Sequence, residues 1–422
     1  MDTIILKRID VEGTRVDYSF QASGKLRKYF RGNNRLFFQY NHDVADVPLS
    51  ILAIPFVANV IPLAWLMDST VVVEELDESF FLSLDPIKAA YQAMFKAYPF
   101  KGEIQTKRTV RNTYEAQHEA AALFSGGLDA LTTFVRIKEQ RPWLVTEYGW
   151  HEEDIKPSEV WEADKGHAVQ FAASNGLSNI LIESNYGTFL HAAEIDYDYS
   201  RKLGDSWWHG LHHGLAIISA AIPIAYKLKI KRIYIASSNT AGYPVPCASD
   251  PTVDNEIKYA SGKVYHDGFE LSRQDKVKAV VDHYSAVGER VNIRVCFKNE
   301  ENCCNCEKCL RTIMGIVAEG HSPRAYGFKV PDNLSAHLER FLRSEVKFFT
   351  PTFISIYWIK IQQRMKENAA AVADRKLLEW FPEYNFKRER RRALIRYRTT
   401  RFFPIIKRKI TTQLKRIREK TQ

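Results

Sequence analysis

The fold class follows from one stretch of sequence, Ala120-Ala121-Ala122-Leu123-Phe124-Ser125-Gly126-Gly127-Leu128-Asp129. Its first five residues are apolar and too few for a helix, which is typical of a buried strand. Two glycines follow, and a helical pattern of apolar residues then runs over residues 129–139. We therefore expect a strand, a tight glycine loop and a helix in direct succession.

Strand and helix patterns continue to alternate after this stretch. The expected strands are residues 144–148, 180–182 and 232–236, and the expected helices are residues 159–175, which end at Gly176, and 211–228. Such alternation predicts an α/β fold with a parallel sheet and helices on both of its faces. Ligands of such sheets bind at the carboxyl ends of the strands.

The segments on either side of this region have different patterns. Residues 1–115 contain short β-rich runs (3–6, 15–20, 35–40 and 71–73) and a helical pattern over 86–98, which predict a small N-terminal α+β domain. We expect this domain to bind a partner or to cover the active site. Residues 116–325 form the α/β domain, and residues 326–422 are expected to be helical and increasingly basic.

Composition and charge exclude several classes of protein. The chain has 422 residues, of which 45% are hydrophobic and 26% charged, and only six are cysteines. These values exclude a mostly disordered, collagen-like or disulfide-scaffold protein. The N-terminus lacks a signal-peptide pattern. Residues 47–67 carry no charge, but they include three prolines and are flanked by aspartates, so we expect a buried core segment and a cytoplasmic protein.

The basic charge is concentrated at the C-terminus. Residues 387–422 hold 15 Lys/Arg and 2 Asp/Glu, a net charge of +13, which leaves −3 for the rest of the +10 chain. Apolar residues at helical spacing between these cations predict a basic amphipathic helix (Phe403, Ile406, Ile410, Leu414, Ile417). Such a helix would dock on a protein partner or pack on the chain's own acidic body, lie on the surface of an anionic membrane, or, less in keeping with its apolar stripe, bind nucleic acid. We also expect the chain to form a homo-oligomer.

The glycine loop has the chemistry of a phosphate site. Gly126 and Gly127 allow a close backbone approach, the following helix offers N–H groups and the positive end of its dipole, and Ser125 adds a hydroxyl donor. Asp129 would organise the loop or hold Mg²⁺. A Walker loop is excluded because no Gly-Lys-Ser/Thr follows. A plain strand-to-helix turn remains the alternative.

Five of the six cysteines fall close together in the sequence. Four of them, Cys296, Cys303, Cys306 and Cys309, are spaced C-x6-C-x2-C-x2-C, which suits a closed, structural Zn²⁺ site. Cys304 is expected to be a bystander, although an exchange of roles with Cys303 stays open. An iron–sulfur cluster and redox thiols are the alternatives.

Together these motifs resemble a known family. Ser-Gly-Gly-x-Asp is similar to the signature of PP-loop ATP pyrophosphatases. The order of loop and cysteines resembles 7-cyano-7-deazaguanine synthases. Two further matches are Tyr148-Gly149, similar to the family's Tyr-Gly-Gln, and Gly242-Tyr243-Pro244, similar to its Gly-Tyr-Pro-Asp-Cys-Arg. The resemblance covers roughly residues 118–320 and implies an adenine nucleotide alpha hydrolase-like fold.

The chain departs from the family at several positions. Ala130 replaces the last serine of the phosphate loop, and Trp150 replaces the glutamine after Tyr-Gly. Val245-Pro246-Cys247 replaces Asp-Cys-Arg. Lost polar contacts change what a binding site selects. We therefore expect a divergent paralogue with a changed substrate, akin to the larger members found in specialised or defence gene sets.

The resemblance implies a mechanism. A substrate carboxylate, deazaguanine-like in the family, attacks the α-phosphorus of ATP with Mg²⁺ bound, and pyrophosphate leaves. Ammonia or an amine then forms an amide, which some members dehydrate to a nitrile. Residues 125–130 (Ser125, Gly126, Gly127, Leu128, Asp129, Ala130) would bind ATP. Lys276 matches a family lysine that would meet the departing phosphates, with a solvated helix lysine as the alternative.

Other residues are assigned by position. Ser237, Ser238 and Asn239 follow an expected strand at the ligand-binding edge, so Ser238 and Asn239, with Tyr148, Gly149, Gly242 and Tyr243, are candidates for substrate binding. His209, His212 and His213 lie before a long apolar helix, where they either act chemically or cap and pack.

Two other functions remain in competition with an amide-forming ligase. The first is tRNA thiolation, which would need a reactive cysteine outside the metal site, such as Cys247 or Cys304. The second is a nucleotide-binding scaffold with weakened catalysis, because Ala130 removes a hydroxyl donor from the loop.

Overall fold

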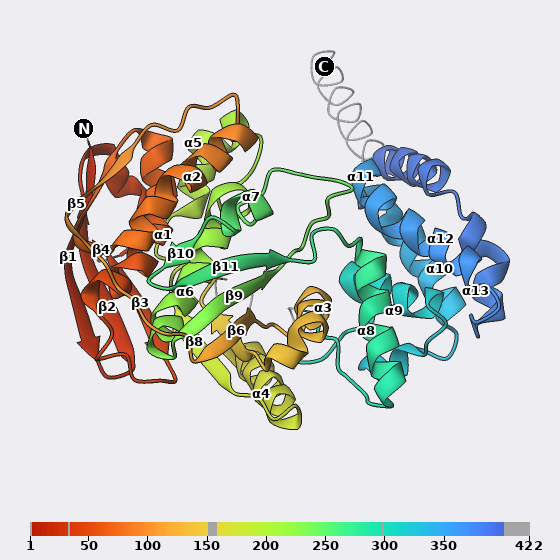
Figure 1. Cartoon of the computed structure of the whole chain (residues 1–422). Coiled ribbons are helices and arrows are strands. Elements are labelled where there is room, and N and C mark those ends of the chain that lie inside the picture. Colours follow the sequence, from red (N-terminus) through yellow and green to blue (C-terminus); the bar gives the residue numbers. More distant parts are fainter. Residues whose placement is uncertain (1, 33, 151–157, 297–298, 401–422) are drawn as a thin grey trace, which may run out of the picture. The chain divides into compact units, whose positions relative to one another are not determined.

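The computed structural model describes residues 2–32, 34–150, 158–296 and 299–400 (Figure 1). The chain divides into two compact units. The first unit comprises residues 1–283 with 293–301, and the second comprises residues 284–292 with those from Asn302 onward. The expected end of the α/β domain near residue 325 is therefore wrong, because the chain already leaves the first unit inside a helix that starts at Arg273.

The first unit is built on one mixed sheet with the strand order β10-β11-β9-β6-β7-β8-β3-β2-β1-β4-β5. Its strands are β1 Thr3–Glu12, β2 Arg15–Ala22, β3 Arg35–Tyr40, β4 Thr70–Asp77, β5 Glu103–Val110, β6 His118–Leu123, β7 Trp143–Tyr148, β8 Asn179–Ser184, β9 Ile230–Ala236, β10 Lys258–Tyr259 and β11 Gly262–Asp267. Its helices are α1 Leu49–Met67, α2 Glu78–Met94, α3 Leu128–Ile137, α4 Ser158–Ser174, α5 Ala192–Leu203, α6 His213–Lys227, α7 Pro251–Asp254 and the first part of α8 Arg273–Val287.

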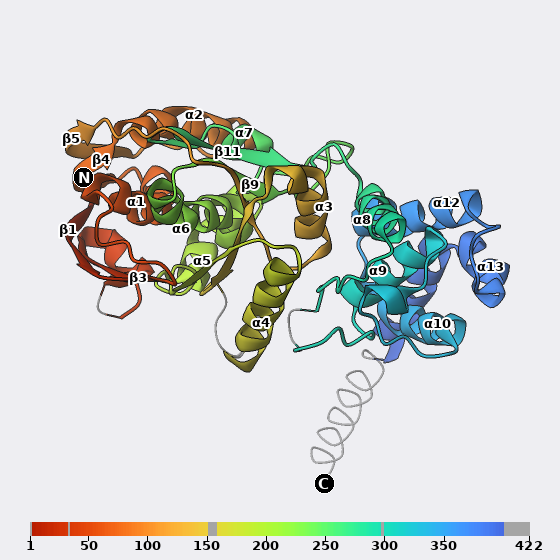
Figure 2. The same ribbon diagram turned by 60° about the horizontal axis from the view of Figure 1, so that its bottom comes forward.

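Five neighbouring strands confirm the expected parallel sheet. β11, β9, β6, β7 and β8 are mutually parallel, with Ala121 of β6 opposite Ile233 of β9 on one side and Trp143 of β7 on the other. Helices cover both faces, as expected for an α/β fold: α6 packs on β9 and β8, while α3 and α4 pack on the opposite face against β6, β7, β8 and β9 (Figure 2). The first strand of this Rossmann-like set, β6, is central.

Residues 1–115 do not form a separate domain, which corrects the expected boundary. The antiparallel strands β1–β3 extend the parallel set, since β3 pairs with β8 through Phe38 opposite Ser184 and Tyr40 opposite Ile182. Phe38 also stacks on Tyr186 at 6.0 Å between ring centroids. The pattern of short strands predicted β1–β3 correctly, but it carries no information about which partner strand they pair with.

The sheet curls around two apolar helices. Helix α2 contacts β4 and β5 at one end of the strand order and β10 at the other, and α1 packs side by side with α6 on the inner face (Figure 2). Helix α1 has the length and apolarity of a membrane span, yet the most apolar part of it is 94% buried within the protein. It is therefore a core helix, as the prolines and flanking aspartates predicted.

The second unit is helical, as expected for the C-terminal region. Its helices are the last part of α8, α9 Glu307–Ala318, α10 Leu334–Glu345, α11 Pro351–Phe353, α12 Ile359–Glu367 and α13 Arg375–Trp380. Trp358 is fully buried and stacks on Phe349 at 5.8 Å. The predicted basic amphipathic helix over 403–417 lies outside the described residues.

Candidate functional site

The glycine loop lies where ligands bind in parallel sheets. Strand β6 has β7 on one side and β9 on the other, so the connections after β6 and after β9 leave the sheet at the point where strand order reverses. Gly126 adopts φ +69°, a left-handed conformation that glycine accepts without strain. Gly127 is the N-cap residue of α3, whose first backbone N–H groups have no acceptor within the helix. The loop thus has the form of an anion site.

A buried arginine, Arg294, holds the glycine loop through a backbone hydrogen bond. This residue was not predicted from the sequence as part of the site. The backbone N–H of Arg294 donates to the carbonyl of Gly126 at 2.8 Å. Its buried guanidinium pairs with Asp164 of α4 and donates to the carbonyl of Glu300. Arg294 therefore connects the loop to the segment that carries Cys296. A charged residue two positions before that cysteine was the signal available in the sequence.

Lys276 and Asp129 meet beside the loop. The Lys276 ammonium lies 3.1 Å from a carboxylate oxygen of Asp129 and also donates to the carbonyl of Ser237, directly after β9. Its side chain is only 3% exposed, so the alternative of a solvated helix lysine is wrong. Arg273, one turn earlier on α8, lies 3.4 Å from the other oxygen of Asp129. Two cations and one carboxylate therefore stand next to the glycine loop.

Nearby threonines do not replace the hydroxyl that Ala130 lacks. Ala130 is buried on α3. The Thr132 hydroxyl donates to the carbonyl of Leu128 at 2.9 Å, and the Thr133 hydroxyl donates to Asp267 at 2.8 Å. Both threonines are buried. Ser125 is therefore the hydroxyl that the loop itself presents to solvent.

Tyr148 and Gly149 end β7 at the same edge of the sheet. The Tyr148 ring stacks on Trp161 of α4, with centroids 5.1 Å apart. Gly149 has φ +120°, and a Cβ atom there would stand 1.7 Å from the carbonyl oxygen of Ser184. Gly149 is therefore required by a close backbone approach. Trp150 stacks on Trp208 at 5.9 Å.

The residues after β9 divide into a buried and an exposed group. Ser237 is buried, and its hydroxyl donates to the carbonyl of Asn239 at 3.0 Å. Ser238 and Gly242 are exposed, and Tyr243 is 41% exposed with its N–H bonded to the carbonyl of Thr240. The connection therefore presents its backbone to Lys276 and the side chain of Tyr243 to solvent.

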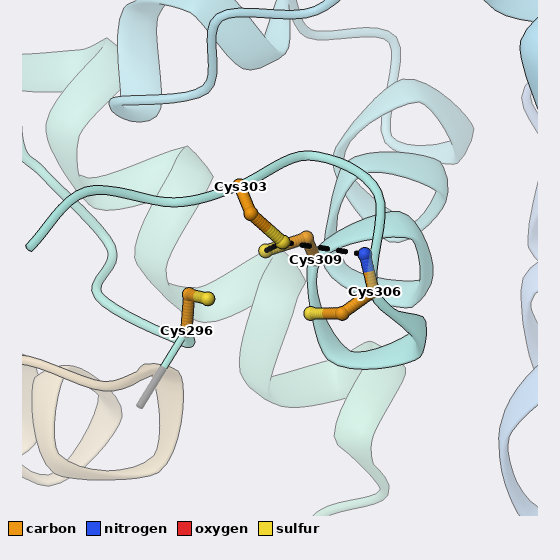
Figure 3. Close-up of side chains that lie close together, drawn as sticks. All are labelled: Cys296, Cys303, Cys306 and Cys309. Atoms are coloured by element: carbon orange, nitrogen blue, oxygen red, sulfur yellow. Dashed lines mark hydrogen bonds between the residues drawn. The ribbon is translucent and has the colours of Figure 1, made fainter. Parts of the chain in front are cut away.

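The four cysteines predicted as metal ligands come together. The sulfur atoms of Cys296, Cys303, Cys306 and Cys309 lie within 4.8 Å of one another (Figure 3). Cys303 and Cys309 are 3.9 Å apart at sulfur, and the Cys306 N–H donates to the Cys303 sulfur at 3.3 Å. Tetrahedral Zn²⁺ with four thiolates at about 2.3 Å would separate sulfurs by about 3.8 Å. The donor set therefore fits zinc.

Cys304 is not part of this set. It adopts φ +54°, and its sulfur lies 3.5 Å from the carbonyl of Asn302. The expectation that Cys304 is a bystander is thus in agreement with the geometry of the four-sulfur group.

A second polar cluster, named here the Cys247 cluster, consists of Asp205, His209, His213 and Cys247. His209 Nδ1 is 2.6 Å from Asp205, and His213 Nε2 is 3.8 Å from the Cys247 sulfur. Burial opposes ionisation of Cys247, but hydrogen bonds from His209 and His213 outweigh it and lower the pKa of the thiol to about 6. The hydrogen bond to Cys247 raises the pKa of His209 to about 9.

His212 has a packing role instead. It is fully buried against Trp207, and its Nε2 lies 2.9 Å from the side-chain oxygen of Asn59 on α1. Burial lowers its pKa to about 3, so it is neutral near pH 7. The spacing Asp205-x3-His209-x3-His213 was the signal that could have separated the two cluster histidines from His212.

Comparison of the chain with protein-family models and with curated proteins finds no match.

Proposed function

We propose that this chain is an ATP-dependent carbon–nitrogen ligase of the PP-loop ATP pyrophosphatase type, with an adenine nucleotide alpha hydrolase-like fold and a cytoplasmic location. The observation that carries the proposal is the buried Lys276 ammonium held between Asp129 and the Ser237 carbonyl, next to Ser125–Asp129 at the carboxyl edge of β6. Six free cysteines fit a reducing compartment.

Each part of this site has a role in activating a carboxylate. The backbone N–H groups of Gly126, Gly127 and the first turn of α3 bind the phosphates of ATP. Lys276 and Arg273 offset the charge that develops as pyrophosphate departs, and Asp129 orients both cations. Mg²⁺, when bound, adds further positive charge at the phosphates. Ammonia or an amine then attacks the acyl carbon of the adenylated acid, an amide forms, and AMP leaves.

The substrate acid would lie beside Tyr148 and the exposed residues that follow β9. The Tyr148–Trp161 stack offers an aromatic surface, and Tyr243 is accessible from solvent. A planar, deazaguanine-like acid suits such a surface. Trp150 and Val245-Pro246-Cys247 differ from the family motifs, which supports a changed substrate.

The four-cysteine group would hold one structural Zn²⁺. Four thiolates close the coordination shell, so no position is open for a substrate. Its role would be to fix the fold of the segment that starts at Cys296, which Arg294 joins to Gly126.

The test is a pyrophosphate-release assay with Mg-ATP, 7-carboxy-7-deazaguanine and ammonium, in which products are identified by mass spectrometry. We expect release that depends on the acid, with an amide or nitrile as product. Asp129→Ala should lower the rate on the order of 100-fold, because both cations lose the carboxylate that orients them.

Other outcomes of this assay would favour a different substrate or a different function. Pyrophosphate release only with a different acid would keep the chemistry and change the substrate. Release coupled to sulfur incorporation into tRNA would favour thiolation. ATP binding without pyrophosphate release under any of these conditions would contradict the ligase and leave a nucleotide-binding scaffold.

A further inference from the structure

The Cys247 cluster brings a thiol, two imidazoles and a carboxylate together outside the phosphate loop. Asp205, His209 and His213 follow one another at four-residue intervals along one segment, which passes through the π-helical turn η3 (Trp208–His212) into α6. Cys247 comes from the connection after β9 and is buried against them. The group is therefore assembled from two parts of the chain.

Hydrogen bonds fix the orientation of both imidazoles. His209 Nδ1 is 2.6 Å from the carboxylate of Asp205, and His213 Nδ1 is 2.9 Å from the carbonyl of Trp208. Both partners only accept, so each Nδ1 carries a proton and each Nε2 is left for the thiol side. For His213, the Nε2 to sulfur distance is 3.8 Å. A thiol between two oriented imidazoles is the arrangement that activates a cysteine nucleophile.

The electrostatic environment agrees with this geometry. The pKa of the Cys247 thiol is lowered to about 6, so the thiolate predominates at neutral pH. Burial opposes the charged form of His213, but hydrogen bonding to Cys247 raises its pKa above the usual value. A low thiol pKa beside a histidine distinguishes reactive cysteines from inert buried ones.

The backbone holds Cys247 in place. The N–H of Ala248 donates to the carbonyl of His209 at 2.7 Å, and the Tyr91 hydroxyl donates to the carbonyl of Ala248 at 3.2 Å. A Cβ atom on Gly214 would stand 2.3 Å from that same carbonyl oxygen, so only glycine permits the approach. The cluster is thus built into the fold through fixed contacts.

The cluster is connected to the proposed ATP site through one segment. The connection after β9 starts at Ser237, whose carbonyl accepts from Lys276, and reaches Cys247 ten residues later. Trp208 of η3 stacks on Trp150, which follows Gly149 at the end of β7. The residues between Ser237 and Cys247 are exposed or half-buried, and the Tyr243 side chain is 41% exposed.

We propose that Cys247 is a second catalytic residue, which takes the activated acyl group from the adenylate as a thioester and passes it to the amine. This inference rests on the proposed ligase function. The thiolate attacks the acyl carbon, a C–S bond forms, and the C–O bond to AMP breaks with its electrons leaving on AMP. The amine then attacks the same carbon, a C–N bond forms, and the C–S bond breaks to restore the thiolate.

The three neighbouring side chains have different roles in these steps. Acylation of Cys247 removes the interaction that raises the pKa of His209, so His209, whose side chain is 48% exposed, first releases its own proton to solvent and then accepts the proton that the attacking amine loses. His213 stabilises the thiolate. Asp205 is a positioning residue, because it acts by holding His209. Burial of the sulfur keeps water away from the thioester, which favours aminolysis over hydrolysis.

The test uses the full chain with Mg-ATP and 7-carboxy-7-deazaguanine in the absence of any amine. After an acid quench, intact-mass and peptide analysis should find the acyl group on Cys247, removable by neutral hydroxylamine. Cys247→Ser should still release pyrophosphate, show no adduct and form amide at least 100-fold more slowly. Cys304→Ser should behave as the wild type. Pyrophosphate release without an adduct, or unchanged amide formation by Cys247→Ser, would overturn the proposal.

A second measurement separates this proposal from the ligase itself. Alkylation of Cys247 by iodoacetamide needs no substrate, and its rate should rise with a midpoint near pH 6. His213→Gln should move the midpoint upward, whereas an ordinary thiol profile in the wild type would overturn the activated thiolate. Tyr91 and Asp254 also face the cluster, so Tyr91→Phe and Asp254→Asn serve to measure the influence of each on the midpoint. Absence of pyrophosphate release in the wild type would overturn both proposals, and the alkylation profile would still report the state of the thiol.

Discussion

Gly149 allows the end of β7 to pass the backbone of Ser184 at a distance that no other residue permits. Its φ of +120° is accessible to glycine alone, and an added Cβ would stand 1.7 Å from a carbonyl oxygen. We expect Gly149→Ala to lower the free energy of unfolding by about 3 kcal/mol. Chemical denaturation with urea measures this change.

Gly166 is the matched control for this substitution. It lies within α4, and a Cβ there would have no neighbour within 4 Å. Gly166→Ala should therefore stabilise the protein by roughly 0.5–1 kcal/mol, because alanine is the better helix former. Equal changes in the free energy of unfolding for Gly149→Ala and Gly166→Ala would contradict a close backbone approach at Gly149.

Individual side chains were predictable where a motif fixes their spacing, and unpredictable where contact depends on the fold. The grouping of the four thiols follows from short intervals in the sequence. Lys276 was expected beside the phosphates only through the family resemblance, because Asp129 is 147 positions away. Arg294 was missed, and Cys247 was named only as a candidate reactive thiol without its histidine partners, since the partners of both residues come from segments that only the folded sheet brings together.

At the scale of elements, Asp77 joins parts of the chain from both ends of the sheet. Its buried carboxylate caps α2 through the N–H of Phe80, accepts from the Asn112 side chain, and accepts from the N–H of Ala260 between β10 and β11. Each partner is 2.9–3.0 Å away. One carboxylate therefore contributes to closing the sheet around α1 and α6.

We expect Asp77→Ala to destabilise the protein by about 3 kcal/mol, since it removes a cap and leaves buried donors without an acceptor. Asp374→Ala, which removes the cap of α13 alone, should cost about 1 kcal/mol. Urea denaturation of both variants tests this ranking. If Asp77→Ala lowers the free energy of unfolding no more than Asp374→Ala does, the hydrogen bond from Ala260 contributes nothing to stability.

Element types were largely predictable, and their limits and partners were not. The helix expected over 86–98 starts at Glu78 and contains Pro86, because the Asp77 cap and burial of Phe80 and Leu84 outweigh one missing backbone hydrogen bond. Strand β5 was missed because all of its residues are exposed or half-buried, so it lacks an apolar pattern. It forms through pairing with β4 instead.

At the scale of the whole molecule, the four-cysteine group should determine metal content and thermal stability. We expect one Zn²⁺ per chain by elemental analysis. Cys306→Ser should lose the metal and lower the melting temperature by at least about 5 °C, because metal binding contributes directly to folding.

Cys304→Ser is the control for metal binding. Cys304 adjoins Cys303 in sequence but lies outside the four-sulfur group, so this variant should keep its zinc and its melting temperature. Loss of zinc from Cys304→Ser with retention in Cys306→Ser would contradict the ligand assignment.

The division of the molecule was the least predictable feature. A change of pattern near residue 115 suggested a boundary, yet β3 continues the sheet by pairing with β8. Backbone hydrogen bonds between strands depend on register and twist, which the side-chain pattern of one strand does not encode. A truncated chain lacking residues 1–115 would expose β8 and α6, so its loss of activity would not identify a partner-binding role.

The central claim is that Lys276 and Asp129 serve a loop that cleaves ATP between its α and β phosphates. The most direct test is to follow ATP with Mg²⁺ and 7-carboxy-7-deazaguanine by phosphorus NMR, comparing wild type, Lys276→Met and Lys278→Met. Lys278 lies on the same helix but pairs with Asp282 at the surface, so it controls for the loss of a charge. We predict AMP and pyrophosphate from the wild type and Lys278→Met, and on the order of 100-fold less from Lys276→Met. ADP and phosphate as products, or equal rates for the two lysine variants, would contradict the claim.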